Sequence, residues 1–105
     1  MEKQELKKRI TSLVKEISGR YPFVKSYWVS LQEENKSYLL VLAYIVELDS
    51  GAKTLTLSSS LAEDDLLDEV FLLDLLRKIE DLSCKVLNDL DRFNQILKRR
   101  QVGVI

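Results

Sequence analysis

The first apolar positions of the chain recur at helical spacing. Between Glu2 and Ser18, leucine, isoleucine and valine side chains stand three or four residues apart, with lysines and glutamates between them. Gly19 favours a left-handed cap, and Pro22 prevents a helix from resuming. This pattern predicts an amphipathic helix over about residues 2–18.

Three runs that follow favour a pleated sheet. Residues 23–31 (FVKSYWVSL) are rich in aromatic and β-branched side chains, and residues 38–48 (YLLVLAYIVEL) are almost entirely apolar. Residues 53–58 (KTLTLS) alternate leucine with threonine and serine, which is typical of a half-exposed strand. Polar breaks at residues 32–37 and 49–51 separate the runs. The three runs therefore predict an antiparallel meander.

The second half of the chain begins with a helix signal. Ser60 and Glu63 have the spacing of a capping box, and acids follow in the first turn, where the helix dipole favours them. We expect a long helix over about residues 61–82, and its apolar positions cover far more than one stripe. This helix is therefore expected to be buried on more than one side.

The remaining segments predict a further strand and a further helix. Residues 83–90 (SCKVLNDL) favour a short strand, residues 91–100 (DRFNQILKRR) a helix capped by Asp91, and residues 101–105 an extended end. The length is that of one domain. We therefore predict a single α+β domain over residues 1–105, with helices packed on a small antiparallel or mixed sheet in the order α-β-β-β-α-β-α.

The run 38–48 is apolar at both its odd and its even positions, so both faces of this strand need cover. If all the helices lie on one side, the larger even face forms an apolar patch that a soluble monomer rarely exposes. Either a helix crosses to the second face or another chain covers it, and we favour another chain because tyrosine is enriched at interfaces. The predicted interface residues are Trp28, Tyr38, Leu40, Leu42, Tyr44, Val46 and Phe71.

The net charge is only −1, but the charges are segregated along the chain. Residues 1–25 carry seven Lys/Arg against three acids, residues 26–91 five against fourteen, and residues 92–105 four against none. The basic ends predict solvated helix surfaces or, if both ends share a face, a patch for phosphate groups. The candidate phosphate contacts are Lys7, Lys8, Arg9, Lys98, Arg99 and Arg100.

Several kinds of chemistry lack the residues they need. The chain has no histidine, one cysteine and three glycines, which argues against Ser-His or Cys-His nucleophiles, structural zinc sites and phosphate-cradling loops. Asp64 with Asp68, and Asp65 with Glu69, stand four residues apart and could share a hard cation. Acids in the first turns of a helix have a reason to be there without a metal. We expect no catalytic residues, no metal and no cofactor.

The chain also predicts where the protein works. The segment MEKQELKKRI lacks the apolar core of a signal peptide, and the apolar run 38–48 is shorter than the roughly 20 residues that a membrane helix needs. With Cys84 as the one cysteine, no disulfide can form within the chain. We expect a cytoplasmic protein that does not enter the membrane.

Three segments carry a resemblance to a known family. LVKEISGRYPFVKSYWVSL, YLLVLAY and LNDLDRFNQILKRR resemble the C-terminal domain of the enhanced-serine-sensitivity (SseB) family, although Ser26 stands where that family has alanine. There a helix precedes a V-x-A-Y type of strand, a hydrophobic hairpin strand follows, and a strand–helix unit closes the domain. The family has no established catalytic residues, so the resemblance implies a fold.

The predicted element order and the acidity are also similar to those of small dimeric type III secretion chaperones, which bind unfolded segments of partner proteins. That likeness implies a protein partner. The hypothesis from the sequence is a non-enzymatic intracellular protein-interaction module, chaperone-like or regulatory, in a homodimer or hetero-complex. The alternative is a nucleic-acid-binding accessory protein that uses the basic terminal helices.

Overall fold

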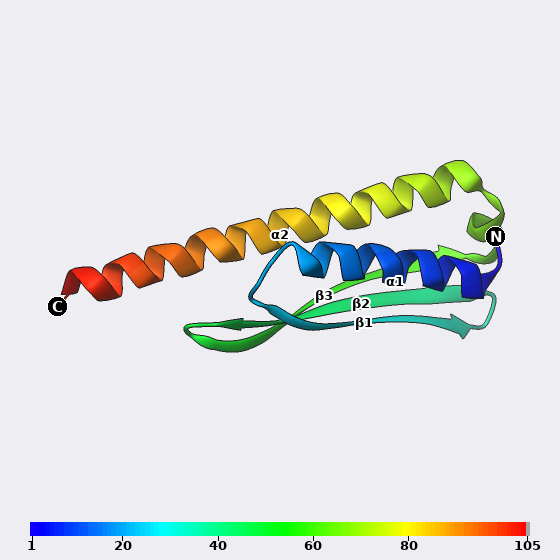
Figure 1. The fold of residues 1–105 in the computed structure, drawn as a ribbon. Helices are drawn as coiled ribbons and strands as arrows, with labels where there is room; N and C mark the ends of the chain where they lie inside the picture. Colours follow the sequence, from blue (N-terminus) through cyan, green and yellow to red (C-terminus); the bar gives the residue numbers. More distant parts are fainter. Residues whose placement is uncertain (105) are drawn as a thin grey trace.

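The computed structural model describes the backbone of residues 1–104 and the side chains of residues 1–99. A helix, three strands, a short 3-10 helix and a second helix follow one another (Figure 1). Their bounds are α1 Lys3–Gly19, β1 Val24–Glu34, β2 Ser37–Leu48, β3 Gly51–Ala62, η1 Glu63–Leu67 and α2 Glu69–Val104. The chain is thus an α+β fold, as predicted, although the predicted element order is not exact.

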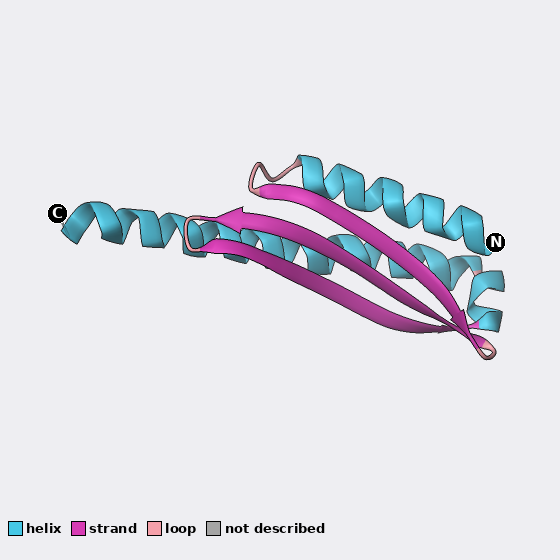
Figure 2. Cartoon of the chain, turned by 90° about the horizontal axis from the view of Figure 1, so that it is seen from below, coloured by secondary structure: helices cyan, strands magenta, loops and turns pink. Residues whose placement is uncertain are grey.

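The three strands form an antiparallel sheet in the order β1-β2-β3. Leu42 of β2 pairs with Val29 of β1 on one side and with Leu57 of β3 on the other. Because side chains alternate between the faces of a strand, the even positions of β2 share a face with odd positions of both neighbours. Both helices lie on this one face, and Figures 1 and 2 show the opposite face of the sheet without a helix.

The core lies between the helices and the sheet. Helix α1 buries Leu6, Ile10, Val14 and Ile17 completely, one apolar stripe at helical spacing. Helix α2 contributes buried residues such as Leu72, Ile79 and Leu87. Beneath both helices, the even positions of β2 from residue 40 onwards are buried. These residues are Leu40, Leu42, Tyr44, Val46 and Leu48.

The prediction that the even face of residues 38–48 needs another chain was therefore wrong. Leu40, Leu42, Tyr44 and Val46 are at most 2% exposed, beneath helices of their own chain. The physical reason is the strand register, which places the even positions of β2 on the same face as Leu55 and Leu57 of β3. Both helices pack on that face, so the chain itself covers the larger side chains of β2.

The predicted strand over residues 83–90 and the separate helix over residues 91–100 were also wrong, since both segments belong to α2. No glycine or proline stands between positions 69 and 102, so nothing in this stretch breaks a helix. Positions 101–104, expected to be extended, are helical, and Ile105 lies outside the described residues.

The start of α2 also differs from the prediction. β3 continues to Ala62, so Ser60 lies in a strand and does not cap a helix. The cap of α2 is Asp68, whose Oδ1 accepts a hydrogen bond from the backbone N–H of Phe71 at 3.1 Å. In η1 the contact runs the other way, since Asp65 lies inside the helix and its Oδ2 accepts from the backbone N–H of Ala62, the residue before this helix, at 2.7 Å.

An exposed apolar flank and groove beside helix α2

Helix α2 carries two neighbouring apolar stripes. The first faces the body of the protein and consists of Leu72, Leu76, Ile79, Ser83, Leu87, Leu90 and Asn94. The second, which we call the α2 flank, consists of Leu75, Leu82, Val86, Asp89, Phe93 and Ile96. Four apolar side chains of the flank remain substantially exposed: Leu82 at 51%, Val86 at 37%, Phe93 at 52% and Ile96 at 49%.

The flank has the spacing of a helix that packs against another helix. From Leu72 to Ile96, the flank residues together with Ile79 alternate steps of three and four, the heptad pattern of paired helices. Leu72 and Ile79 are buried, whereas from Leu82 onwards the same stripe faces solvent. An ideal α-helix drifts by about 20° per heptad from a strict seven-residue repeat, which turns the stripe gradually away from the core.

Polar contacts fix the rotation of α2 about its axis. Among the side chains that the structure describes, the two buried polar residues are Ser83 and Asn94, both in the body-facing stripe. The hydroxyl of Tyr44 donates to Ser83 Oγ at 2.9 Å, and the backbone N–H of Asp49 donates to Asn94 Oδ1 at 3.3 Å. Burial raises the pKa of the Tyr44 hydroxyl, and the hydrogen bond to Ser83 opposes the shift. Turning the flank inward would leave these buried groups unpaired.

Further contacts hold the opposite side of α2 against the end of α1. The hydroxyl of Tyr21 lies 2.8 Å from Asn88 Oδ1, and Arg20 forms an ion pair with Glu80 at 3.5 Å. Arg20 Nη1 also lies 3.4 Å from the sulfur of Cys84, which is half-buried. These contacts lie on the side of α2 that faces α1, and none of them involves a residue of the flank.

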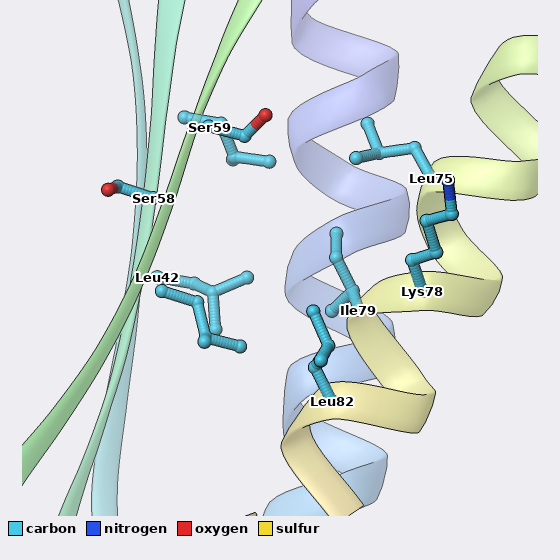
Figure 3. A pocket seen from close by; sticks show the side chains of 9 residues that line it. Leu42, Ser58, Ser59, Leu75, Lys78, Ile79 and Leu82 are labelled. Atoms are coloured by element: carbon cyan, nitrogen blue, oxygen red, sulfur yellow. The ribbon is translucent and has the colours of Figure 1, made fainter.

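A groove separates the flank from β3. One hollow of about 210 Å³ lies between Leu57 of β3 and Leu75 and Leu82 of α2, and Figure 3 shows Leu75, Ile79 and Leu82 pointing from the helix towards the sheet. A second hollow of about 90 Å³ lies between Leu57 and Val86. The two hollows meet at Leu57 and are lined mostly by apolar side chains; the polar lining residues are Ser58, Ser59 and Lys78 in the first and Thr56 and Ser83 in the second. We call the two hollows together the α2–β3 groove.

The groove is bordered by a strand edge. β3 is an outer strand of the sheet, so half of its backbone N–H and C=O groups have no partner strand. Proteins blunt such edges with charges, prolines or bulges. β3 has an unbroken register with β2 from Gly51 to Ala62, contains no proline, and carries one charged residue, Lys53. This edge is therefore open to a further strand.

Three of the seven predicted interface residues line the α2–β3 groove, Leu40 and Leu42 in the larger hollow and Tyr44 in the smaller one, and the other four do not lie on this surface. Of the seven, all of which the structure describes, Trp28 alone is exposed, at 48%, and it lies on the helix-free face of the sheet beside Ala43. Tyr38 is half-buried, with the ammonium of Lys3 at 5.9 Å from its ring centre, and Phe71 is also half-buried. The exposed residues Leu82, Val86, Phe93 and Ile96 were missed, because the strand assigned to residues 83–90 hid their heptad spacing.

The candidate phosphate contacts do not form one patch. Lys7, Lys8 and Arg9 lie near the start of α1, and Lys98 and Arg99 near the end of α2, at opposite ends of a molecule whose longest dimension is 58 Å (Figures 1 and 2). Arg9 pairs with Glu5 at 3.4 Å, and Lys98 lies 3.9 Å from Asp49. The side chain of Arg100 lies outside the described residues.

The acidic residues near the start of α2 act locally. Asp65 accepts a hydrogen bond from the backbone N–H of Ala62 at the start of η1, and Asp68 accepts one from the backbone N–H of Phe71 at the start of α2. Within the described part of the chain, no three His, Cys, Asp or Glu side chains gather closely enough to hold a metal ion. Neither described helix is long and apolar enough to cross a membrane.

Comparison of the chain with protein-family models, with curated proteins and with solved structures gives no match.

Proposed function

We propose that this chain is a non-enzymatic intracellular protein-interaction module whose interface is the α2 flank together with the β3 edge. The observation that carries the proposal is the row of exposed apolar side chains beside an apolar groove. Leu82, Val86, Phe93 and Ile96 are exposed while Ser83 and Asn94 of the same helix are buried. An isolated chain would be more stable with the apolar side chains buried and the polar ones exposed, since burying apolar area is favourable and burying polar groups is costly.

The surroundings of the flank match the anatomy of a protein interface. Such surfaces have an apolar centre and a polar rim, and their centre is poor in charges. Asp89 is the one charged residue of the flank, and the exposed cations Lys78, Lys85 and Arg92 border it on the solvent side. A catalytic role has less support, because the chain has no histidine to act as a general base at neutral pH.

Site-specific photocrosslinking in cells tests this proposal. A benzophenone amino acid at Val86 should form covalent adducts with protein, whereas the same group at the exposed Lys15 of α1 should not. Adding Leu82→Glu should abolish the adduct at Val86, because a carboxylate at the contact would be desolvated without a partner. Equal labelling at Val86 and Lys15, or an adduct that survives Leu82→Glu, would contradict the proposal.

The alternative of nucleic-acid binding requires the two basic ends to act together, and they lie at opposite ends of the molecule (Figure 1). Fluorescence anisotropy with DNA and RNA at increasing salt separates the two functions. We expect weak binding without sequence preference. Tight binding that weakens steeply as salt rises would favour the nucleic-acid function.

A further inference from the structure

We infer that the partner at the α2 flank is a second copy of this chain, related to the first by a two-fold axis normal to the sheet. The axis passes β3 at Leu57 and passes α2 between Leu82 and Val86. This inference rests on the proposed function, since it names the occupant of the same surface.

The position of the axis follows from the groove. Leu57 lines both hollows, and it faces Leu82 in one and Val86 in the other. Leu57 in the sheet layer therefore lies at the level of the midpoint between Leu82 and Val86 in the helix layer. A single two-fold axis can therefore pass through the centre of the contact in the sheet layer and in the helix layer, as an isologous dimer requires.

In the sheet layer, the axis pairs β3 with β3 of the second copy in an antiparallel register. Leu57 then stands opposite its own copy, Leu55 opposite Ser59, and Lys53 opposite Leu61. No two like charges face each other along this edge, since Lys53 is the one charged residue in β3. The result is a continuous six-stranded sheet with all helices on one face.

In the helix layer, the same axis pairs the two α2 flanks antiparallel. Leu82 then faces Val86 of the second copy, and Leu75 faces Phe93, so apolar residues meet apolar residues. Asp89, which stands four residues after Lys85 on its own helix, comes beside Lys78 of the second copy. Lys78 pairs with Asp74 at 3.0 Å within its own chain, so in the dimer it lies between two carboxylates. Within one chain, Asp89 and Lys78 are eleven residues apart, about 16 Å along the helix, and cannot pair.

The basic residue nearest the axis is Lys85, which meets Lys85 of the second copy at the solvent side. Asp81 and Asp89 stand four residues before and after it on the same helix and supply the opposite charge. The like pair of lysines therefore does not prevent association.

The surface is large enough for a stable dimer. A strand of 12 residues is about 40 Å long, and the sheet layer plus the helix layer are together about 20 Å deep. The strip they present is therefore about 800 Å² per copy, the ordinary size for a specific interface.

A charge-swap series measured by sedimentation equilibrium tests the pairing. The parent should be a dimer of about 24.4 kDa, twice the 12.2 kDa of one chain. Lys78→Glu and Asp89→Lys should each weaken association roughly tenfold, because each places like charges together twice in a symmetric dimer. The double variant should return to within about threefold of the parent, since the pair is restored with its signs exchanged. Lys15→Glu, on α1, is the matched control and should leave association unchanged.

The outcomes distinguish the inference from the function on which it rests. A dimeric parent whose double variant stays as weak as the singles would overturn the pairing, and so would an equal effect of Lys15→Glu. The parent could instead be monomeric at every concentration while Val86 still crosslinks to a different protein. That result would overturn the inference that the partner is a second copy, but it would leave the interaction function standing. A monomeric parent with no adduct at Val86 would overturn both.

Discussion

The hydrogen bond between Tyr44 and Ser83 fixes which side of α2 faces the sheet, so its removal tests the orientation of the flank. Tyr44 is 1% exposed and Ser83 is 2% exposed, and the two hydroxyl oxygens are 2.9 Å apart. Tyr44→Phe removes the donor and leaves Ser83 Oγ buried without this partner. Ser83→Ala removes the acceptor and leaves the hydroxyl of Tyr44 buried without this partner.

Each single substitution should lower the free energy of unfolding by about 1–3 kcal/mol, the cost of leaving a buried polar group unpaired. The double variant leaves neither group behind, so it should cost less than the sum of the singles. The difference, which measures the coupling between the two residues, should be about 1–2 kcal/mol.

The free energies are obtained from urea denaturation of the parent, the two single variants and the double variant, all at one protein concentration. A positive coupling energy supports the contact and the rotation of α2 that it fixes. If the two single effects add within about 0.5 kcal/mol, the two residues are independent and their contact does not fix the rotation of α2.

Three further predictions concern the core, the cap of α2 and pH. Leu87→Ala should lower the free energy of unfolding by about 2–5 kcal/mol, because Leu87 is fully buried; a loss below 1 kcal/mol in urea denaturation would place it outside the core. Asp68→Ala should cost about 1 kcal/mol through loss of the cap, and an unchanged urea midpoint would contradict that role. Burial raises the pKa of Tyr44, so the unfolded chain releases this proton at lower pH than the folded protein, and stability should fall as pH rises above about 10. Tyr44→Phe should flatten that decline in urea midpoints measured from pH 8 to 11 without abolishing it, because the pKa of Tyr21 is also raised; an unaltered decline would contradict the assignment.

The first helix and the three strands were predictable to within a few residues, because each carries a clear period. The helical spacing before Gly19 and the leucine alternation in residues 53–58 are local signals. α2 was harder, because Ser83, Asn88 and Asp89 interrupt its apolar pattern in a way that suggests a strand end. In the structure Ser83 belongs to the buried stripe, and its hydrogen bond to Tyr44 explains a polar residue there.

The face of β2 that becomes the core could not be read from residues 38–48 alone, because both faces are apolar. The register decides it. Tyr44 pairs with Leu55, and Leu42 with Leu57, so the even face of β2 joins the leucine face of β3. The leucine alternation of β3 indicated a buried face, but the register depends on the turn between the strands, where Gly51 adopts a φ of 120°.

Hydrogen exchange of the β3 amides, measured at low and high protein concentration, tests whether the flank and the β3 edge are an interface in solution. If the flank and the β3 edge are joined to a second copy, the outward amides between Gly51 and Ala62 should exchange more slowly as concentration rises. The outward amides of β1, at the other edge of the sheet, should not change and serve as the control. Outward β3 amides that exchange equally fast at every concentration would contradict a dimer joined along the β3 edge.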